Sequence, residues 1–333
     1  MDQRGTVPQG EAPVGRSTVR QGGESVTAAI EMRGLTKVFG EVRALDGVDL
    51  SVASGSVFGF LGPNGAGKTT TLRILTGMAR PSGGSATIAG FDVTRRADEV
   101  SRRVGYLPDV PGFYDWMRGE EFLRFAGGLF ATPKATLDER VEVLLDLAGL
   151  AGLKTRIGGY SRGMKQRLGI AQALINAPRV LMLDEPTSAL DPIGRKEVLD
   201  MVASLRGRTT VFFSTHILSD VERVCDTVAV LNKGRVVAHS SVDELKRRGA
   251  RGRIGVELES GAGELARALE RQPWVEAVTV AGNTLSVAAN DVAAARKSIP
   301  AVVAAHGLSL CRFDTGETSL EEAFVDLVGD GRQ

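Results

Sequence analysis

The sequence predicts an α/β protein built around a largely parallel sheet, followed by a small α+β domain. Short apolar segments predict the sheet, because they recur at residues 56–61, 179–183 and 209–214 and each is followed by loop or helix-start residues. The chain of 333 residues is also longer than one typical domain. We therefore expect two domains, of which the first contains the parallel sheet.

Composition and apolar spacing divide the chain into three parts. Residues 1–27 are rich in Gly, Pro, Gln, Ser and Arg and lack periodic apolar positions, which predicts a disordered lead-in. The core domain is expected at residues 28–245, with an α-helical insertion at about 94–165, where leucines and valines recur at helix-like spacing. An accessory domain is expected at residues 250–333.

The apolar pattern of the accessory domain predicts the order strand, helix, strand, strand, helix, strand. The predicted elements are residues 254–258, 264–270, 277–280, 284–288, 291–305 and 308–313, with a final helix at 320–328. This βαββαβ order is typical of a ferredoxin-like domain. The segment contains no ligand motif, and dimerisation, regulation and simple capping of the core all stay open as roles.

The composition excludes several functional classes. Lys and Arg number 41 against 40 Asp and Glu, so the net charge of +1 gives no overall field to attract nucleic acid. Cys225 and Cys311 lack CxxC or Cys/His spacing, which argues against a disulfide framework or a metal site and fits a reducing cytoplasm. The longest apolar run, 301–305, is far shorter than the roughly 20 residues that a transmembrane helix needs.

A glycine-rich segment satisfies the GxxxxGK[ST] pattern of a phosphate-binding loop. It follows the candidate strand that ends at Leu61 and precedes a helix-like run at 69–78, which is the context that the motif requires. Its glycines let backbone N–H groups turn towards phosphate oxygens, Lys68 supplies a cation to the β- and γ-phosphates, and Thr69 offers its hydroxyl to Mg²⁺. The alternative is a glycine-rich turn that binds nothing. The candidate nucleotide-binding residues are Gly62, Pro63, Asn64, Gly65, Ala66, Gly67, Lys68, Thr69 and Thr70.

Two further strand ends have polar residues that suit phosphate chemistry. The apolar segment 180–183 ends in Asp184 and Glu185, of which one can hold Mg²⁺ and the next can polarise an attacking water. The segment 209–215 leads to His216, which can hydrogen-bond a γ-phosphate or orient the water. Each pattern alone also fits a strand that ends in a polar residue to reach solvent.

Residues 160–167, Tyr-Ser-Arg-Gly-Met-Lys-Gln-Arg, resemble the LSGGQ signature of ABC-type ATPases at the start of a helix. In this family the signature of one subunit closes over the nucleotide held by the phosphate loop of the other. The resemblance implies that Ser161 and Gly163 meet the γ-phosphate, which the helix dipole favours. It also implies that Phe39 stacks on adenine and that Asp191 belongs to the segment linking the two sites.

The resemblance covers about residues 30–240 and implies a P-loop NTPase core of the ABC ATPase type that uses ATP and Mg²⁺. A narrower similarity to the daunorubicin-resistance, or ABC-2 type, exporter ATPases rests on the signature, on Gly-Tyr-Leu-Pro at 105–108 and on Ser-Leu-Glu-Glu-Ala-Phe at 319–324. Those ATPases are separate chains paired with a separate permease. This similarity implies a role in exporting a drug-like or lipophilic substrate and in antibiotic resistance.

Three positions depart from the family pattern. Asp109 replaces the glutamine that senses Mg²⁺ and the permease in many members; its carboxylate can still hold Mg²⁺ but cannot donate a hydrogen bond unless it is protonated. Arg162 and Met164 replace a glycine and a glutamine of the signature, whereas Ser161 and Gly163 keep the positions where the backbone approaches the nucleotide. We therefore expect the signature to close normally.

These residues predict an ATPase that acts as a homodimer, which ATP bound between the two copies stabilises. Glu185 would polarise the attacking water, His216 would hold the γ-phosphate end of the site, and Lys68 with Mg²⁺ would stabilise the leaving charge. The partner would be an integral membrane permease in a separate chain, so the ATPase is expected in the cytoplasm, on the inner face of the cell membrane. No nucleic acid partner is expected.

The permease contact is expected at the start of the helical insertion, near residues 109–121. Phe113, Tyr114 and Trp116 lie there, and they form either a contact surface or a local core.

Two other functions remain as alternatives. Soluble ABC ATPases act in DNA repair or on ribosomes, but they usually have two cassettes or a long coiled-coil insertion, whereas this chain has one GxxxxGK[ST] and no sustained heptads. A nucleotide-gated scaffold would bind ATP and dimerise with little hydrolysis. Glu185 disfavours the scaffold, because an inactive site often lacks that acid.

Overall fold

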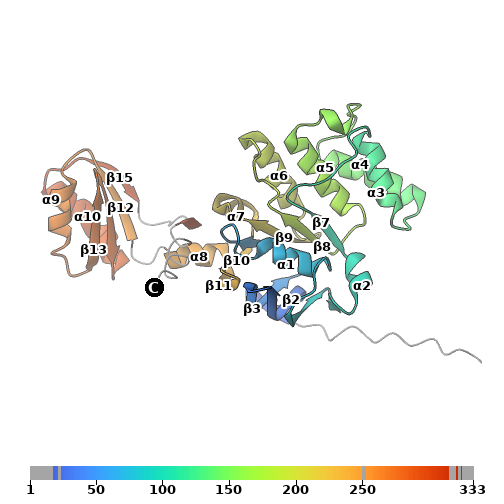
Figure 1. The fold of residues 1–333 in the computed structure, drawn as a ribbon. Coiled ribbons are helices and arrows are strands. Elements are labelled where there is room, and N and C mark those ends of the chain that lie inside the picture. Colours follow the sequence, from blue (N-terminus) through green and yellow to red (C-terminus); the bar gives the residue numbers. More distant parts are fainter. Residues whose placement is uncertain (1–17, 22–23, 250–252, 315–319, 322–323, 325–333) are drawn as a thin grey trace, which may run out of the picture. The chain divides into compact units, whose positions relative to one another are not determined.

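The structure is a computed structural model that describes residues 18–21, 24–249, 253–314, 320, 321 and 324 (Figure 1). The chain forms two compact units, residues 1–239 and residues 240–333, and each is described by itself. Among the described residues, no helix is both long enough and apolar enough to cross a bilayer.

A six-stranded sheet forms the centre of the first unit. Its strands in sheet order are β11 (Arg235–Ser241), β10 (Thr227–Asn232), β4 (Val57–Leu61), β9 (Thr210–Thr215), β8 (Val180–Asp184) and β7 (Val104–Leu107). The pairs from β10 to β7 are all parallel, and every residue of β4, β8 and β9 is buried. Strands covered on both faces need continuous apolar runs, which is the pattern that the sequence shows. The predicted parallel sheet is therefore confirmed.

A second, antiparallel sheet, which was not predicted from the sequence, packs against the first. Its strands are β1 (Thr18–Gln21), β2 (Glu24–Phe39), β3 (Val42–Ala53), β5 (Gly83–Ile88) and β6 (Phe91–Asp92). Apolar side chains from both sheets and from helix α1 (Lys68–Leu75), among them Met32, Phe60 and Leu72, share one core cluster. The core thus fixes the start of α1, next to the glycine-rich segment.

The predicted disordered lead-in differs from the structure at residues 18–21 and 24–27. Strand β1 pairs antiparallel with the start of β2, with Thr18 opposite Thr27 and Val19 opposite Val26. These β-branched residues favour extended backbone, and that preference outweighs the polar composition of the segment. Residues 1–17, 22 and 23 lie outside the described residues.

The predicted helical insertion at 94–165 is wrong at residues 104–107, which form strand β7 of the central sheet. A strand of four residues is too short for its period to stand out between two helices. The helices around it are α2 (Ala97–Ser101), α3 (Gly119–Gly128), α4 (Lys134–Leu147) and α5 (Arg162–Leu174), with the short 3₁₀ turn Ile157–Gly159 before α5. Helices α3, α4 and α5 contact one another, and α5 also packs on β7.

The first unit is completed by α6 (Pro192–Ser204) and α7 (Leu218–Val224), which contact each other. Helix α7 packs on β4 and β9. Because it begins two residues after His216, its packing fixes the loop that holds this histidine.

The second unit has the element order that the sequence predicted. Its elements are α8 (Val242–Gly249), β12 (Arg253–Leu258), α9 (Ala262–Leu269), β13 (Val275–Ala281), β14 (Thr284–Ala289), α10 (Val292–Ala305) and β15 (Leu310–Asp314). The sheet order is β13-β14-β12-β15, and all three pairs are antiparallel. Residues such as Val256, Leu265 and Val287 form one apolar core. The final predicted helix, 320–328, lies mostly outside the described residues.

Candidate functional site

The glycine-rich segment links the end of β4 to the start of α1. Gly67 caps α1 with φ of 112°, a conformation that favours glycine, and a Cβ atom there would lie 2.6 Å from the carbonyl oxygen of Ala44. A Cβ on Gly62 would lie 2.4 Å from the carbonyl oxygen of Leu231. Both glycines are required by the packing of the loop, which leaves its backbone N–H groups at a helix N-terminus, where phosphate binds readily.

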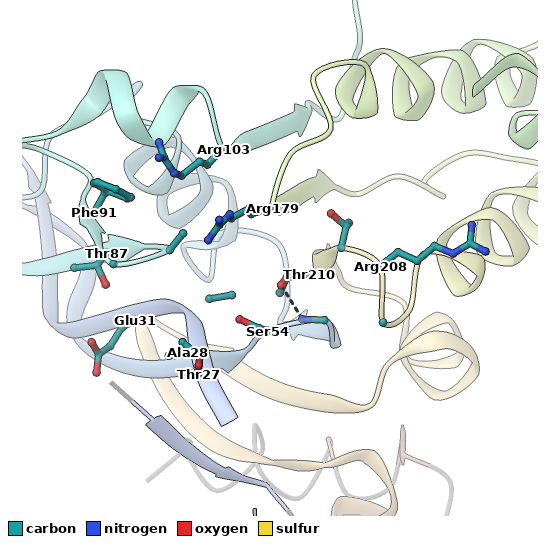
Figure 2. A pocket seen from close by; sticks show the side chains of 16 residues that line it. Thr27, Ala28, Glu31, Ser54, Thr87, Phe91, Arg103, Arg179, Arg208 and Thr210 are labelled. Carbon is teal, nitrogen blue, oxygen red and sulfur yellow. Dashed lines mark hydrogen bonds between the residues drawn. The ribbon is translucent and has the colours of Figure 1, made fainter. Parts of the chain in front are cut away.

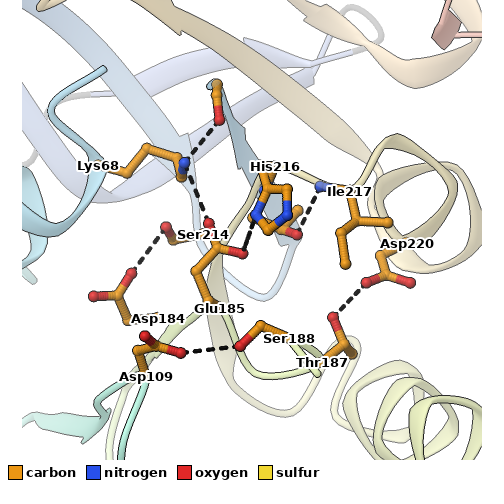
Figure 3. Close-up of polar contacts among 12 residues, drawn as sticks. Lys68, Asp109, Asp184, Glu185, Thr187, Ser188, Ser214, His216, Ile217 and Asp220 are labelled. Carbon is orange, nitrogen blue, oxygen red and sulfur yellow. Dashed lines mark hydrogen bonds and ion pairs between the residues drawn. The ribbon is translucent and has the colours of Figure 1, made fainter. Parts of the chain in front are cut away.

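Lys68 is a buried cation inside this loop, with an exposed fraction of 6%. Its Nζ donates hydrogen bonds to the carbonyl oxygens of Gly62, at 2.7 Å, and Pro63, at 3.2 Å. It also forms an ion pair with Glu185 Oε1 at 3.2 Å (Figure 3). The structure thus brings the predicted loop lysine and the predicted catalytic acid into contact.

Asp184 is the last residue of β8 and is 1% exposed. Burial raises the pKa of this carboxyl group, whereas hydrogen bonds with the Thr69 and Ser214 side chains lower the pKa. The bond from Ser214 Oγ measures 3.2 Å. Thr69 and Asp184, both predicted as Mg²⁺ ligands, therefore lie together at the carboxyl edge of the sheet.

Glu185 and His216 lie side by side after two neighbouring strands. Glu185 has φ of 48°, which is uncommon for a residue with a side chain, and its backbone N–H donates to the carbonyl oxygen of Ser214 at 2.9 Å. Its Oε2 lies 2.9 Å from His216 Nδ1. Each carboxylate oxygen of Glu185 thus faces one basic side chain, Lys68 or His216.

Asp109 contacts the segment that the sequence predicted to link two sites. Ser188 Oγ donates a hydrogen bond to Asp109 Oδ1 at 3.0 Å (Figure 3). The Asp109 charge also helps to raise the pKa of Asp184, although burial is the main cause. The described residues contain no group of three or more His, Cys, Asp or Glu side chains that could hold a metal by themselves. Mg²⁺ commonly takes only one or two carboxylates together with substrate phosphates, so this donor set fits it.

The signature residues form a separate group. Ser161 caps α5 by accepting a hydrogen bond from the Met164 N–H at 3.2 Å, and Asp191 caps α6 by accepting one from Gly194 N–H at 3.1 Å. A Cβ on Gly163 would lie 3.3 Å from Gly194 Cα, so the two helix starts touch. Within the described part of the chain, no hydrogen bond or ion pair joins Ser161 or Asp191 to the phosphate loop.

Phe39 lies at the end of β2 with 53% of its surface exposed. Lys37 Nζ lies 4.7 Å from the centre of its ring and covers one face. While the lysine stays there, only the other face of the ring can stack on a base. Among the residues that the structure describes, this ring has no hydrogen-bond, ion-pair or ring contact with Lys68 or Glu185.

A cavity of about 670 Å³ lies away from the candidate site, and none of the candidate site residues lines it (Figure 2). Its wall includes Arg103, Arg179 and Thr210, near the amino ends of the parallel strands. The predicted chemistry is at the carboxyl ends of those strands, as is usual for α/β sheets. Buried charge, rather than cavity volume, marks the candidate site.

A buried network that was not predicted from the sequence lies directly behind the site. Asp220 is fully buried and accepts hydrogen bonds from Thr187 Oγ1 at 2.5 Å and from Arg195 Nε at 2.6 Å. No local pattern marks these three residues, because they belong to three different elements. The available signal is that Thr187 follows Glu185 by two residues and Asp220 follows His216 by four.

The aromatic residues of the predicted permease contact are partly exposed. Tyr114 is 41% and Trp116 is 63% exposed, whereas Phe113 packs against Phe122 with ring centres 5.3 Å apart. Phe113 and Tyr114 line a cavity of about 410 Å³ together with Phe125 and Leu129, and Trp116 packs against Tyr114 with ring centres 5.0 Å apart. Surface and local core are thus combined in this loop.

A phosphate loop between β4 and α1, with acids and a histidine at the ends of the adjoining parallel strands, defines a P-loop ATPase. The sequence model of the ABC transporter family matches residues 45–188. The ABC transporter ATP-binding protein YxlF of Bacillus subtilis, which is itself uncharacterized, is 38% identical over 300 residues, 90% of this chain and 99% of that protein. The chain therefore belongs to the ABC transporter ATP-binding proteins, and it is an ATPase.

Several relatives are named for drug resistance or antibiotic transport. The daunorubicin resistance ATP-binding protein DrrA3 of Streptomyces coeruleorubidus is 39% identical over 92% of this chain and 97% of its own length. The bacitracin transport ATP-binding protein BcrA of Bacillus licheniformis is 34% identical over 92% and 99%. A solved ATP-binding subunit of an ABC transporter matches 66% of this chain and 92% of its own, with a TM-score of 0.60 and 30% identity. The chain is thus homologous to ATP-binding proteins named for drug resistance and antibiotic transport.

Proposed function

We propose that two copies of this chain bind two ATP molecules head to tail and that ATP hydrolysis drives a separate membrane permease. The observation that supports this most directly is the split arrangement of the site. Lys68, Asp184 and Glu185 converge at the carboxyl edge of the sheet, whereas Ser161 and Gly163 lie at another helix start with no described contact to them. A second copy facing the first would complete the site.

Each side chain near the loop has a role that its position supports. Lys68 would bind the β- and γ-phosphates, for which it must leave Glu185 Oε1. Glu185, once released, would accept a proton from the attacking water, and His216 would hold the γ-phosphate end through its imidazole. Phe39 would stack on adenine, and the loop residues 62–70 would surround the phosphates.

Mg²⁺ would be held by Thr69, Asp184 and Asp109, and it would neutralise charge on the phosphate oxygens. The buried carboxyl group of Asp184 fits this role, because a cation would offset the burial that raises its pKa. Asp109 would reach the Mg²⁺ ion from its present position, in which it accepts a hydrogen bond from Ser188.

From the partner copy, Ser161 and Gly163 would meet the γ-phosphate at the N-terminus of α5, where the helix dipole favours an anion. Asp191 would join the two sites through the cap of α6. Arg162 is exposed beside them, so the substitution at this signature position does not disturb packing.

We propose that the permease docks on the aromatic loop that includes Tyr114 and Trp116. Tyr114 lines an apolar cavity, and the exposed ring of Trp116 packs beside it, so the pair is suited to hold a partner helix or loop. Docking there would hold the ATPase in the cytoplasm, on the inner face of the membrane. The names of the related resistance and transport proteins support export of a drug-like or lipophilic substrate.

We further infer that the accessory domain, residues 250–333, is ferredoxin-like. The βαββαβ element order and the antiparallel sheet order β13-β14-β12-β15 support this assignment. The ATPase domain would then occupy residues 28–245.

The test is the molar mass of the Glu185→Gln protein, measured by light scattering with and without MgATP. Because this variant would bind ATP without hydrolysing it, we expect a shift from monomer to dimer only with MgATP. The matched control, Glu142→Gln on the exposed surface of α4, should show no lasting shift. A Glu185→Gln protein that binds ATP and stays monomeric would contradict the head-to-tail dimer.

A further inference from the structure

Asp220 is a buried carboxylate that the proposed chemistry does not use. It lies in the first turn of α7 and has no exposed surface. An ionised group without solvent is stabilised only when it is paired and hydrogen-bonded, and Asp220 has both kinds of partner. Thr187 Oγ1 donates to Oδ2 at 2.5 Å, and the Arg195 guanidinium donates to Oδ1 at 2.6 Å (Figure 3 shows the first bond).

The first partner holds the turn that follows Glu185. Thr187 is 1% exposed, so its bond to Asp220 is shielded from water. The turn has left-handed backbone at both ends, with φ of 48° at Glu185 and 53° at Ala189. Such conformations cost about 1–3 kcal/mol each and persist only where surrounding contacts determine them. The bond from Thr187 is one such contact, two residues from the carboxylate that faces Lys68.

The second partner extends the network to another helix. Arg195 belongs to the first turns of α6, and its guanidinium also donates to Ser219 Oγ at 2.6 Å. Asp220 and Ser219 both belong to α7, which begins directly after the His216 loop. In that loop, Thr215 Oγ1 accepts a hydrogen bond from the Ile217 N–H at 3.0 Å. The network therefore joins the turn after Glu185, the start of α6 and the helix after His216.

We propose that Asp220 is a positioning residue for ATP hydrolysis, which fixes Glu185 and His216 relative to each other by holding Thr187 and Arg195. This inference rests on the proposed roles of Glu185 and His216. Asp220 does not touch either side chain in the structure's hydrogen-bond network, so it acts through the backbone of the turn and of α7. Loss of the network should slow the chemical step and leave ATP binding unchanged, because Lys68 and the phosphate loop lie outside it.

The central experiment compares Thr187→Val with Thr187→Ser. Valine keeps the shape of threonine but cannot donate to Asp220, whereas serine restores the donor. We expect Thr187→Val to lower kcat about tenfold or more, with KM and the dissociation constant for ATP within about twofold, because a bond to a buried charge is lost. Thr187→Ser should restore kcat to within about twofold of the unchanged protein.

One further variant controls for a general effect of losing a buried hydroxyl, and others test the rest of the network. Thr209→Val removes a buried bond, from Thr209 Oγ1 to the carbonyl oxygen of Pro178 at 2.6 Å, at the other end of β9, and should leave kcat unchanged. Arg195→Gln removes the positive charge but keeps an N–H donor for Asp220, and it should lower kcat with the same KM. Urea denaturation of each variant shows that it is folded before the kcat values are compared. In the Asp220→Ala background, where the acceptor is gone, Thr187→Val should have little added effect.

An unchanged kcat in both Thr187→Val and Arg195→Gln would overturn the proposal. Equal losses in Thr187→Val, Thr187→Ser and Thr209→Val would also overturn it, since they would show a merely structural role. Glu185→Gln is measured in parallel. If Glu185→Gln keeps full kcat, the proposed function of Glu185 fails; if it loses kcat while the Thr187 and Arg195 variants do not, only the positioning role fails.

Discussion

In the first unit, charged side chains such as Lys68, Asp184 and Asp220 are buried, whereas the buried side chains described in the second unit are aliphatic apart from Trp274. A buried polar group costs free energy unless it is satisfied, so a fold that keeps several of them has a use for them. The second unit is stabilised by apolar burial between its helices and one sheet face. The difference indicates that chemistry belongs to the first unit, and that cavity volume is a poorer guide to it than buried charge.

The largest expected effect tests this division directly. Glu185→Gln in the first unit should lower kcat for ATP by about 100-fold or more, because a general base contributes about that much. Steady-state phosphate release measures the effect. Glu264→Gln, at an exposed position of α9 in the second unit, is the matched control and should stay within about twofold. Comparable losses in both variants would break the division.

The second prediction concerns stability in the second unit. Leu265 is fully buried, and Leu265→Ala should lower the free energy of unfolding of this unit by about 2–5 kcal/mol. Urea denaturation monitored by Trp274 fluorescence, with the tryptophan of the first unit replaced, measures the change. Val280→Ala, at a position that is 42% exposed, should change it by about 0.5 kcal/mol or less. A fall in kcat while Leu265→Ala is still folded would show that the second unit controls the first.

The third prediction tests whether the exposed aromatic loop of the first unit is its docking surface. Trp116→Ala should weaken binding to washed membranes of the source cells about tenfold or more, because exposed aromatic anchors dominate docking energies. The ATPase activity of the isolated protein should stay within about twofold. Co-sedimentation measures binding, with Val143→Ala, 61% exposed on α4, as the control. Equal binding of Trp116→Ala and the unchanged protein would place the docking surface elsewhere.

The smallest expected effect is a pH dependence of stability in the first unit. His239 lies on β11 and keeps exposed surface, but its ring packs edge-on against Phe58, and this partial desolvation lowers its pKa from the ordinary value of 6.5. The folded state therefore binds a proton less readily than the unfolded chain, so the free energy of unfolding should fall as pH drops below 6.5. Urea denaturation above and below that pH measures the slope. His239→Gln should reduce the slope, and His306→Gln, at a histidine of the second unit, is the control variant.

Contiguous patterns in the sequence were sufficient for much of the first unit. The phosphate loop, the parallel strands and the acids after β8 are each determined by neighbours in the chain, because glycine spacing and continuous apolar runs are local signals. The element order of the second unit was also predictable from the spacing of its apolar residues. The antiparallel sheet and strand β7 were not predicted, since long bulged strands and a strand of four residues give weak periods.

By itself, the sequence determined which residues are present for phosphate chemistry, in which order, and on which kind of element each would lie. Only the tertiary structure decided which of them meet: that Glu185 faces both Lys68 and His216, that Asp109 contacts Ser188, and that Ser161 lies apart. It also placed Asp220 behind the site with Thr187 and Arg195. Such pairs are separated by dozens of residues, and their contacts depend on strand order and helix packing, which no local pattern encodes.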